Sequence, residues 1–232
     1  MIDSIHNPQL KDIRRLARRR GREDAGRFVA EGEDLLEAAD AAGWTPVARF
    51  AAADSGLPGT PVEPAVLDRI SGLGSGTRTL AVYELRWSAP AGPLAIYLHG
   101  VADPGNVGTI LRSALAFGAS SVVLGPGCAD PFGPKAVRAS MGAVFSVPVA
   151  RVTSVSDLPG RTIALAARAG GPLRGPVEGD ATLLIGAERT GLPDEVLAAA
   201  NEVREIPIHS ESLNAAMAAT VALYELTRVQ SG

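Results

Sequence analysis

Three loops in the carboxy-terminal half of the chain combine glycine, small residues and a few polar side chains. In the first loop, 103–114 (DPGNVGTILRSA), Asn106 can cap the helix that follows, and Arg112 stands among apolar residues. An arginine in such surroundings is costly unless it meets an anion or a reacting group, and a surface salt bridge is the ordinary alternative. Arg112 is therefore a candidate for chemistry that involves negative charge.

The second and third loops also carry polar residues next to apolar segments. Gly186 ends an apolar run and permits close approach of a ligand to the backbone, and Glu188 follows as a lone carboxylate. Ser212 and Asn214 stand where the last helix should begin. Taken singly, these residues suit an exposed carboxylate and ordinary helix caps, so the loops gain meaning only when they are considered together.

The elements that must position these loops alternate between strand and helix. Apolar segments that alternate with helices predict a mostly parallel sheet covered on both faces, and hence an α/β fold. The expected strands are 94–101, 120–125, 146–152, 162–167, 182–185 and 203–208. The expected helices are 106–117, 135–142, 193–200 and 213–229.

The residues before this region have a different pattern and predict a small α/β domain. Expected helices are 8–22, 33–42 and 63–73, and expected strands are 27–32, 44–52 and 80–85. The stretch 88–93 (SAPAGP) suits neither helix nor sheet because of its proline and glycine. We therefore place a domain boundary there, with one domain at 1–88 and a second at 94–232.

Basic residues are concentrated in the first expected helix. The net charge of the chain is −3, but seven basic residues lie between Lys11 and Arg22 against a single acid, Asp12. Phosphates dominate nucleic-acid affinity, so such a cluster indicates an RNA contact, with a solvated helix face as the alternative. The candidate RNA-binding residues are Arg14, Arg15, Arg18, Arg19 and Arg20.

Composition restricts the class of protein. With 232 residues and 46% apolar residues, the chain can fold as one large domain or two small ones. No apolar run reaches the roughly 18 residues of a membrane span, and the amino terminus lacks the apolar centre of a signal peptide. The single cysteine, Cys128, favours a reducing compartment. We expect a cytoplasmic protein without a membrane partner.

In this order and on this framework, the three loops resemble the signature motifs of the SpoU/TrmH family of RNA ribose 2′-O-methyltransferases, which belongs to the SPOUT superfamily. The matching residues are Asn106-x-Gly108-Thr109-x-x-Arg112-Ser113-Ala114, Gly186-x-Glu188-x-x-Gly191-Leu192 and Ile206-Pro207…Ser212-Leu213-Asn214. The connecting segment 134–149 also resembles the family. The segment 7–39 is similar to the L30e-like substrate-binding domain fused to many members.

The resemblance implies a trefoil knot in the carboxy-terminal domain and a cofactor, S-adenosylmethionine, held mainly by backbone groups of the second and third loops. By position, the implied cofactor contacts are Gly186, Ile206 and Leu213, with Ala166 added from a preceding strand end. The implied active-site residues are Asn106, Arg112, Glu188, Ser212 and Asn214.

The resemblance also implies a homodimer formed through the carboxy-terminal domain. The last expected helix carries Leu213, Met217, Val221, Tyr224 and Leu226 near one face, which fits such an interface.

The chain departs from the family pattern at two places. Only four residues separate Pro207 from Ser212, where the family usually has a longer loop, and this leaves cofactor contacts of His209 and Ser210 unassigned. His99 stands where the family commonly has an aspartate, and a hydrogen-bonded structural histidine is a simpler interpretation than a catalytic one.

The implied reaction determines what Arg112 must do. A ribose hydroxyl is a weak nucleophile at neutral pH, so the enzyme must place it in line with the methyl group and help it lose its proton. We expect Arg112 to stabilise the developing alkoxide and to contact the neighbouring phosphate. We expect no metal, because the three histidines, His6, His99 and His209, lack ligand spacing.

Two other functions remain open at this stage. One is a non-catalytic RNA-binding or ribosome-assembly factor that retains the fold. The other is methylation of a base by a related knotted enzyme, for which Glu211 is the one acid within the third motif. The L30e-like domain favours ribosomal RNA over transfer RNA as the substrate, either in housekeeping or in self-protection against a ribosome-targeting antibiotic.

Overall fold

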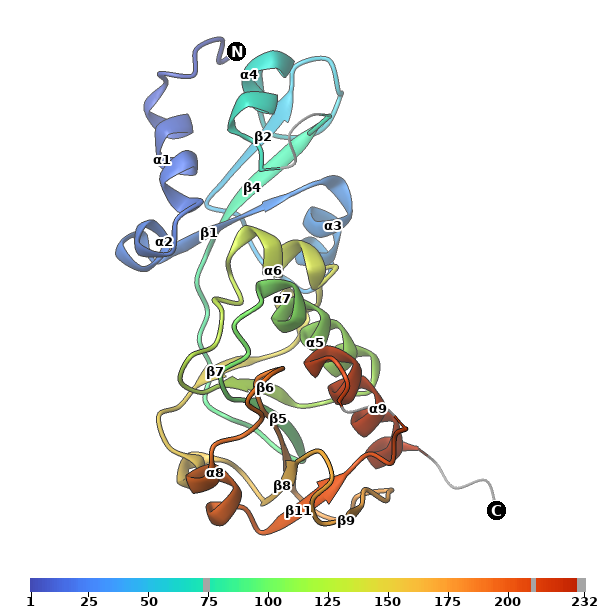
Figure 1. The fold of residues 1–232 in the computed structure, drawn as a ribbon. Coiled ribbons are helices and arrows are strands. Elements are labelled where there is room, and N and C mark those ends of the chain that lie inside the picture. The colour runs from blue at the N-terminus through green and yellow to red at the C-terminus, as the bar shows by residue number, and fades with distance from the viewer. Residues whose placement is uncertain (73–75, 210–211, 229–232) are drawn as a thin grey trace.

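The computed structural model describes residues 1–72, 76–209 and 212–228, and the chain builds two sheets, one in each half (Figure 1). The amino-terminal elements are α1 (Pro8–Leu16), α2 (Arg19–Ala25), β1 (Arg27–Glu31), α3 (Glu33–Ala41), β2 (Ala48–Ala52), β3 (Thr60–Val62), α4 (Pro64–Ile70) and β4 (Thr79–Glu84). Their sheet has the order β1-β4-β2-β3. Strand β4 is antiparallel to both of its neighbours, β1 and β2, whereas β3 is parallel to β2.

Side-chain alternation divides this first sheet into two packed faces. On one face, Val29, Phe50 and Val82 pack with apolar residues of α1 and α4. On the other face, Phe28 and Tyr83 join α3 and a core that continues into the second half of the chain. Successive strand residues point to opposite faces, so one short sheet serves both cores.

The basic segment forms two helices rather than the single helix expected over 8–22. Helical geometry ends after Leu16, and α2 packs back against α1. Gly21 lies inside α2, where an added Cβ would lie 2.1 Å from the carbonyl oxygen of Arg15. The glycine therefore permits a close helix contact and does not end the helix, and Gly26, with φ 62°, is the residue that ends α2.

The second sheet is built from parallel strands. Its elements are β5 (Leu94–Leu98), α5 (Pro104–Ala116), β6 (Ser121–Leu124), α6 (Pro134–Ala139), α7 (Ala143–Ser146), β7 (Val149–Arg151), the 3-10 turn η1 (Val155–Asp157), β8 (Arg161–Leu165), β9 (Gly171–Pro172), β10 (Ala181–Ile185), α8 (Asp194–Ala199), β11 (Glu202–Glu205) and α9 (Ala215–Thr227). The strand order is β7-β6-β5-β10-β8-β11-β9, and neighbouring strands pair in parallel. This confirms the predicted α/β fold with a mostly parallel sheet.

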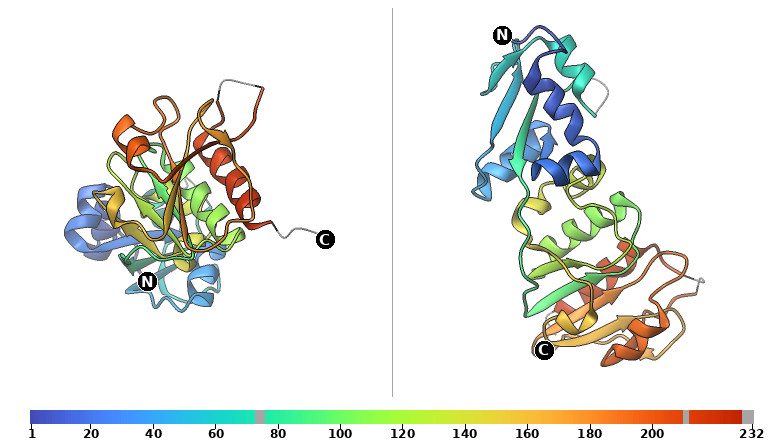
Figure 2. Two further views of the ribbon diagram at one scale, coloured as in Figure 1. Left: turned by 90° about the horizontal axis from the view of Figure 1, so that it is seen from below. Right: turned by 90° about the vertical axis from the view of Figure 1, so that its left-hand side faces the viewer.

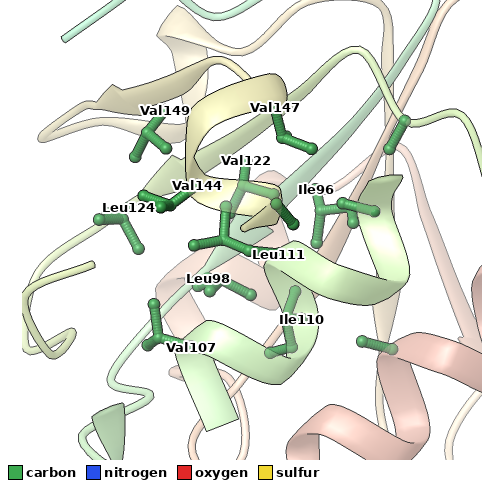
Figure 3. Close-up of a cluster of buried hydrophobic side chains, with 14 of the residues drawn as sticks. Ile96, Leu98, Val107, Ile110, Leu111, Val122, Leu124, Val144, Val147 and Val149 are labelled. Carbon is green, nitrogen blue, oxygen red and sulfur yellow. The ribbon is translucent and has the colours of Figure 1, made fainter. Parts of the chain in front are cut away.

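Both faces of the second sheet are covered. On one face Ile96 and Val122 pack against Leu111 of α5 and Val144 of α7 (Figure 3). On the other face a smaller core includes Tyr97, Leu184 and residues of α8. Burial on both sides explains why these strands are apolar at consecutive positions.

Several boundaries differ from those expected. The strand predicted at 44–52 begins only at Ala48, and the extended segment predicted at 146–152 is reduced to β7 because α7 continues to Ser146. The last helix starts at Ala215. The short strands β3 and β9 were not anticipated, since two or three residues carry no periodic signal.

The two halves share an aromatic core. The ring centroids of Phe28 and Phe132 lie 5.0 Å apart, and those of Trp44 and Phe145 lie 5.3 Å apart. The indole N–H of Trp44 donates to the carbonyl oxygen of Phe145 at 2.8 Å. The stretch 88–93 is held against the second sheet, since Ser88 bridges Ala150.

A buried ion pair also joins the halves. The Arg22 guanidinium binds the Asp130 carboxylate at 2.6 Å, with side chains 5% and 12% exposed. It also donates to the carbonyl oxygens of Leu16 and Ala17. Arg22 therefore belongs to the interior and not to the exposed basic surface in which the sequence pattern included it.

In the described ranges, no helix combines the length and apolar character needed to cross a bilayer.

Candidate active site

Three candidate residues from three different loops meet through their side chains. The Nδ2 group of Asn106 donates to Oε1 of Glu188, and Nδ2 of Asn214 donates to Oδ1 of Asn106 at 3.1 Å. These partners are 82 and 108 positions apart in the sequence, so the contact depends on the fold. Glu188 and Asn106 are half-buried, whereas Asn214 is exposed.

Asn106 can make these bonds because another residue caps its helix. The N-cap of α5 is Asp103, whose Oδ1 accepts from the backbone N–H of Asn106 at 3.1 Å. Lys135 lies 2.8 Å from the other carboxylate oxygen, and this hydrogen bond lowers the pKa of Asp103. The expectation that Asn106 itself caps the helix is wrong, because both residue types are good caps and Asp103 occupies the cap position.

Asn214, in contrast, both caps its helix and takes part in the polar cluster. Its Oδ1 accepts from the backbone N–H groups of Ala216 at 2.9 Å and Met217 at 3.3 Å, which makes it the N-cap of α9. Its Nδ2 group donates to Asn106. The helix start thereby orients the amide toward the cluster of three polar side chains.

Arg112 lies on α5, less than two helical turns after Asn106. Its side chain is exposed and makes no hydrogen bond or ion pair with the residues that the structure describes. The expectation of an arginine in apolar surroundings is therefore wrong, because its apolar neighbours in sequence, Ile110 and Leu111, point into the core. The guanidinium is available to an external anion.

A pocket of about 320 Å³ lies beside this cluster and contains all four candidate cofactor residues, Ala166, Gly186, Ile206 and Leu213. Glu188 and Ser212 also line it. Glu188 thus belongs both to the pocket wall and to the polar cluster. Ser210 and Glu211 of the third loop lie outside the described residues.

Gly186 is required by the close packing of the loop around the pocket. An added Cβ would lie 2.2 Å from the carbonyl carbon of Gly191 and 2.3 Å from the amide nitrogen of Leu192. Ala187 and Gly191 close the turn with two backbone hydrogen bonds of 2.9 and 3.1 Å. Any larger residue at position 186 would displace the backbone that forms the wall.

The lining of the pocket fits S-adenosylmethionine. The volume of the pocket lies within the roughly 300–1,000 Å³ of typical ligand sites. The pocket combines aliphatic walls, which suit an adenine ring, with polar groups of the backbone and side chains. Sequence reasoning missed further lining residues, among them Leu165, Ile185, Leu192, Leu197 and Ala218. Leu165 and Ile185 directly precede Ala166 and Gly186, and Leu192 ends the second motif, but Leu197 and Ala218 reach the pocket from helices and carry no local signal.

His99 lies apart from this cluster. Its Nδ1 is hydrogen bonded to the Tyr97 hydroxyl at 2.9 Å, and both residues line a different pocket with Thr162 and Asn201. Burial raises the pKa of Tyr97 to about 12, so the phenol remains neutral. This geometry favours a structural histidine. Among the described residues, no group of three or more His, Cys, Asp or Glu side chains is arranged to hold a metal ion.

The candidate RNA-binding arginines are all exposed, but they differ in their partners. Ion pairs within α1 and α2 join Arg15 to Asp24, Arg19 to Glu23 and Arg20 to Asp24. Arg14 and Arg18 form no ion pair in the described part of the chain. The latter two carry positive charge that is not neutralised locally.

Comparison with known proteins gives matches in both halves. The model of the SpoU rRNA Methylase family matches residues 93–224, and that of the MRM3-like substrate binding domain matches residues 7–72. An uncharacterized tRNA/rRNA methyltransferase of Synechocystis is 30% identical and aligns over 99% of this chain and 94% of its own length. The 23S rRNA (guanosine(2553)-2′-O)-methyltransferase RlmP of Bacillus subtilis is 29% identical, over 97% and 98%.

Solved structures show the same arrangement over nearly the whole chain. The AdoMet-bound rRNA methyltransferase of Sinorhizobium meliloti superposes with a TM-score of 0.86 at 31% identity, covering 97% of this chain and 96% of that one. The SpoU methyltransferase AviRb of Streptomyces viridochromogenes, in complex with AdoMet, gives 0.83 at 25% identity, covering 96% and 97%. AdoMet is S-adenosylmethionine.

Proposed function

The chain belongs to the SpoU rRNA methylase family, and from this we propose that it transfers a methyl group from S-adenosylmethionine to a ribose 2′-hydroxyl of ribosomal RNA. One observation carries the proposal: Glu188 lines the cofactor-sized pocket and is hydrogen bonded to Asn106, which in turn is bonded to Asn214. The pocket and the polar cluster thus share a wall.

Ala166, Gly186, Ile206 and Leu213 would hold the cofactor in the pocket of the second and third loops. When bound, S-adenosylmethionine supplies a methyl group that its sulfonium has already activated. The aliphatic residues of the pocket would exclude water from the adenine ring, and backbone groups near Gly186 would hydrogen bond to it.

Arg112 would act on the substrate. Its exposed guanidinium, which has no partner among the described residues, can bind a phosphate and stabilise the negative charge that develops on the 2′-oxygen as the hydroxyl proton leaves. Asn106, Glu188 and Asn214 would orient the ribose, with Ser212 at the edge of the pocket.

The RNA substrate would extend from this site over the amino-terminal domain, which we assign to residues 1–88, with the catalytic domain at 94–232. The match of 7–72 to a substrate-binding domain supports this division. The exposed Arg14, Arg15, Arg18, Arg19 and Arg20 would contact phosphates. Relatives named for 23S rRNA favour ribosomal over transfer RNA.

The carboxy-terminal domain would form a homodimer. Met217, Val221 and Tyr224 are 62%, 43% and 59% exposed on α9, and Leu115 on α5 is 48% exposed. Exposed apolar residues gathered on two packed helices are typical of an interface. Leu226, which the sequence pattern placed on the same face, is buried in the core and would not take part.

We also propose that the catalytic domain contains a trefoil knot and that the protein is cytoplasmic. In the sheet order β10 lies between β5 and β8, and β8 separates it from β11, its next strand in the sequence, which is compatible with a threaded chain. The bacterial rRNA methyltransferases among its relatives support the compartment.

Methyl transfer to deproteinised ribosomal RNA tests the proposed function. The RNA is incubated with the protein and tritiated S-adenosylmethionine and then digested to nucleosides. We expect label in a 2′-O-methylnucleoside. Label in a base would indicate a base methyltransferase, and RNA binding without any transfer would indicate a non-catalytic RNA-binding factor.

A further inference from the structure

The amino-terminal region contains a groove of about 520 Å³ that the proposed reaction does not use. It runs between α1 and the first sheet, where β1, β4 and β2 lie side by side, and the right view of Figure 2 shows α1, in dark blue, beside that sheet. The deepest lining residues are apolar: Ile13, Leu16, Phe50 and Val82. The groove therefore offers an apolar surface against which the face of a flat group can pack.

One rim of the groove carries hydrogen-bonding side chains from α1. Gln9, Asp12 and Arg15 follow each other at three-residue spacing and so lie along the same side of the helix. The side chains of Gln9 and Asp12 make no hydrogen bond with the described residues. Arg15 makes an exposed ion pair with Asp24 at 3.2 Å.

The opposite rim comes from the sheet. Arg27 is exposed at the start of β1 and forms no ion pair with any described residue, even though Glu84 lies directly across from it in the strand register. Val47 is 43% exposed, and its backbone N–H is bonded to the carbonyl oxygen of Val82. Arg27 from the sheet thus lines the same groove as Asp12 and Gln9 from α1, together with buried apolar residues.

We propose that this groove binds one unstacked guanine nucleotide of the RNA substrate, an inference that rests on the proposed function. Unpaired bases are recognised by burial of their faces and by hydrogen bonds to their edges, which this combination of floor and rims can supply. Arg15 and Arg27 line the groove and can bind the phosphates on either side of the base.

Asp12 accounts for the choice of base. An ionised carboxylate only accepts hydrogen bonds and has two oxygens to do so. The Watson–Crick edge of guanine presents two adjacent N–H donors, which match those oxygens. The Gln9 amide can accept or donate beside them.

Nuclear magnetic resonance of the full-length, ¹⁵N-labelled protein tests this site with four nucleoside 5′-monophosphates as probes. We expect GMP to shift the amide signals of Arg27, Val47 and Val82, and to bind more tightly than AMP, CMP or UMP. Asp12→Asn should remove the preference for GMP. Arg27→Ala should weaken binding by about tenfold, because hydrogen bonds to charged groups are the stronger class.

Two further variants separate a groove effect from a general effect of charge. Val47→Glu places a carboxylate on an exposed rim position and should also weaken GMP binding. Arg69→Ala removes an exposed arginine from α4, outside the groove, and should leave binding unchanged.

Three outcomes overturn the proposal: shifts that spare the groove, GMP binding that survives Arg27→Ala and Val47→Glu, or identical shifts with inorganic phosphate alone. Methyl transfer to ribosomal RNA is measured on the same preparation. Transfer without nucleotide binding in the groove would remove the groove proposal only. Failure to methylate any RNA would remove the proposed function, whatever the groove binds.

Discussion

The side-chain amide of Asn214 donates a hydrogen bond to the side-chain carbonyl of Asn106 at 3.1 Å, and each asparagine stands at the start of a long helix. The bond ties α9 to α5, which also meet through the hydroxyls of Ser113 and Thr220 at 2.7 Å. The third motif is thereby held against the first, and Glu188 completes the cluster from the second.

Asn214→Asp should separate the two functions of this residue. The aspartate can still accept from the first turn of α9, but it cannot donate to Asn106, so stability should change little while methyl transfer falls by roughly 10²-fold through misplacement of the cluster. Asn214→Ala should lose activity and also about 0.5–2 kcal/mol of helix-cap stability. Steady-state kinetics and urea denaturation provide the two readouts. Full activity of Asn214→Asp would show that only the cap matters.

Arg112→Ala should reduce methyl transfer by on the order of 10²–10³-fold and leave cofactor affinity and folding stability nearly unchanged. The reason is that Arg112 is exposed, has no partner among the described residues and does not line the cofactor pocket. Arg112→Lys should not restore activity, because an ammonium lacks the planar fork of the guanidinium.

Isothermal titration with S-adenosylmethionine and the tritium assay measure the two quantities separately. An equal loss of cofactor affinity in Arg112→Ala would contradict the assigned role. RNA with a single 2′-deoxynucleotide at the modified position should bind and accept no methyl group.

Arg22→Ala should lower the free energy of unfolding by about 3–5 kcal/mol, since it removes one partner of a buried ion pair and leaves the Asp130 carboxylate without its charge partner. Arg20→Ala is the matched control, because that side chain is 94% exposed and should change stability by less than about 0.5 kcal/mol. Chemical denaturation of both variants checks the difference. Equal stabilities would mean that water solvates Asp130 when Arg22 is absent.

Tyr224→Glu should convert a dimer into a monomer without unfolding the chain, because the side chain is 59% exposed in the single chain and a charge at an apolar interface is costly. Light scattering gives the mass, and circular dichroism checks the fold. A monomeric mass for the parent protein at micromolar concentration would contradict the proposed interface.

The parallel sheet could be anticipated from the sequence for a physical reason, whereas the polar cluster was implied by the resemblance of the three loops to the SpoU/TrmH motifs. Strands apolar on both faces must be buried on both sides, and the loops that follow parallel strands share one edge of the sheet. Gly186 was recognisable because it directly follows β10, whereas the role of Glu188 came from the family motif.

Other features depend on contacts between distant residues, which give no signal in the local sequence. In the sequence pattern, Arg22 cannot be distinguished from the solvated arginines around it. Its partner Asp130 is 108 positions away and comes close only in the folded chain. The break after Leu16 is accompanied by close packing of Gly21 in α2 against Arg15 in α1, which is a contact between helices. The surroundings of Arg112 were predicted wrongly, because a run of apolar neighbours in the sequence does not show which side of a helix a residue occupies.

The aromatic core shared by the two halves has a consequence for how the chain comes apart. Phe28 and Trp44 in one half and Phe132 and Phe145 in the other belong to a single buried cluster, so neither half can lose its packing without exposing rings of the other. Melting should therefore be cooperative across the entire chain, with one calorimetric transition in place of two. A fragment cut at residue 88 would expose Phe28 and Trp44 to water, and such a surface promotes aggregation.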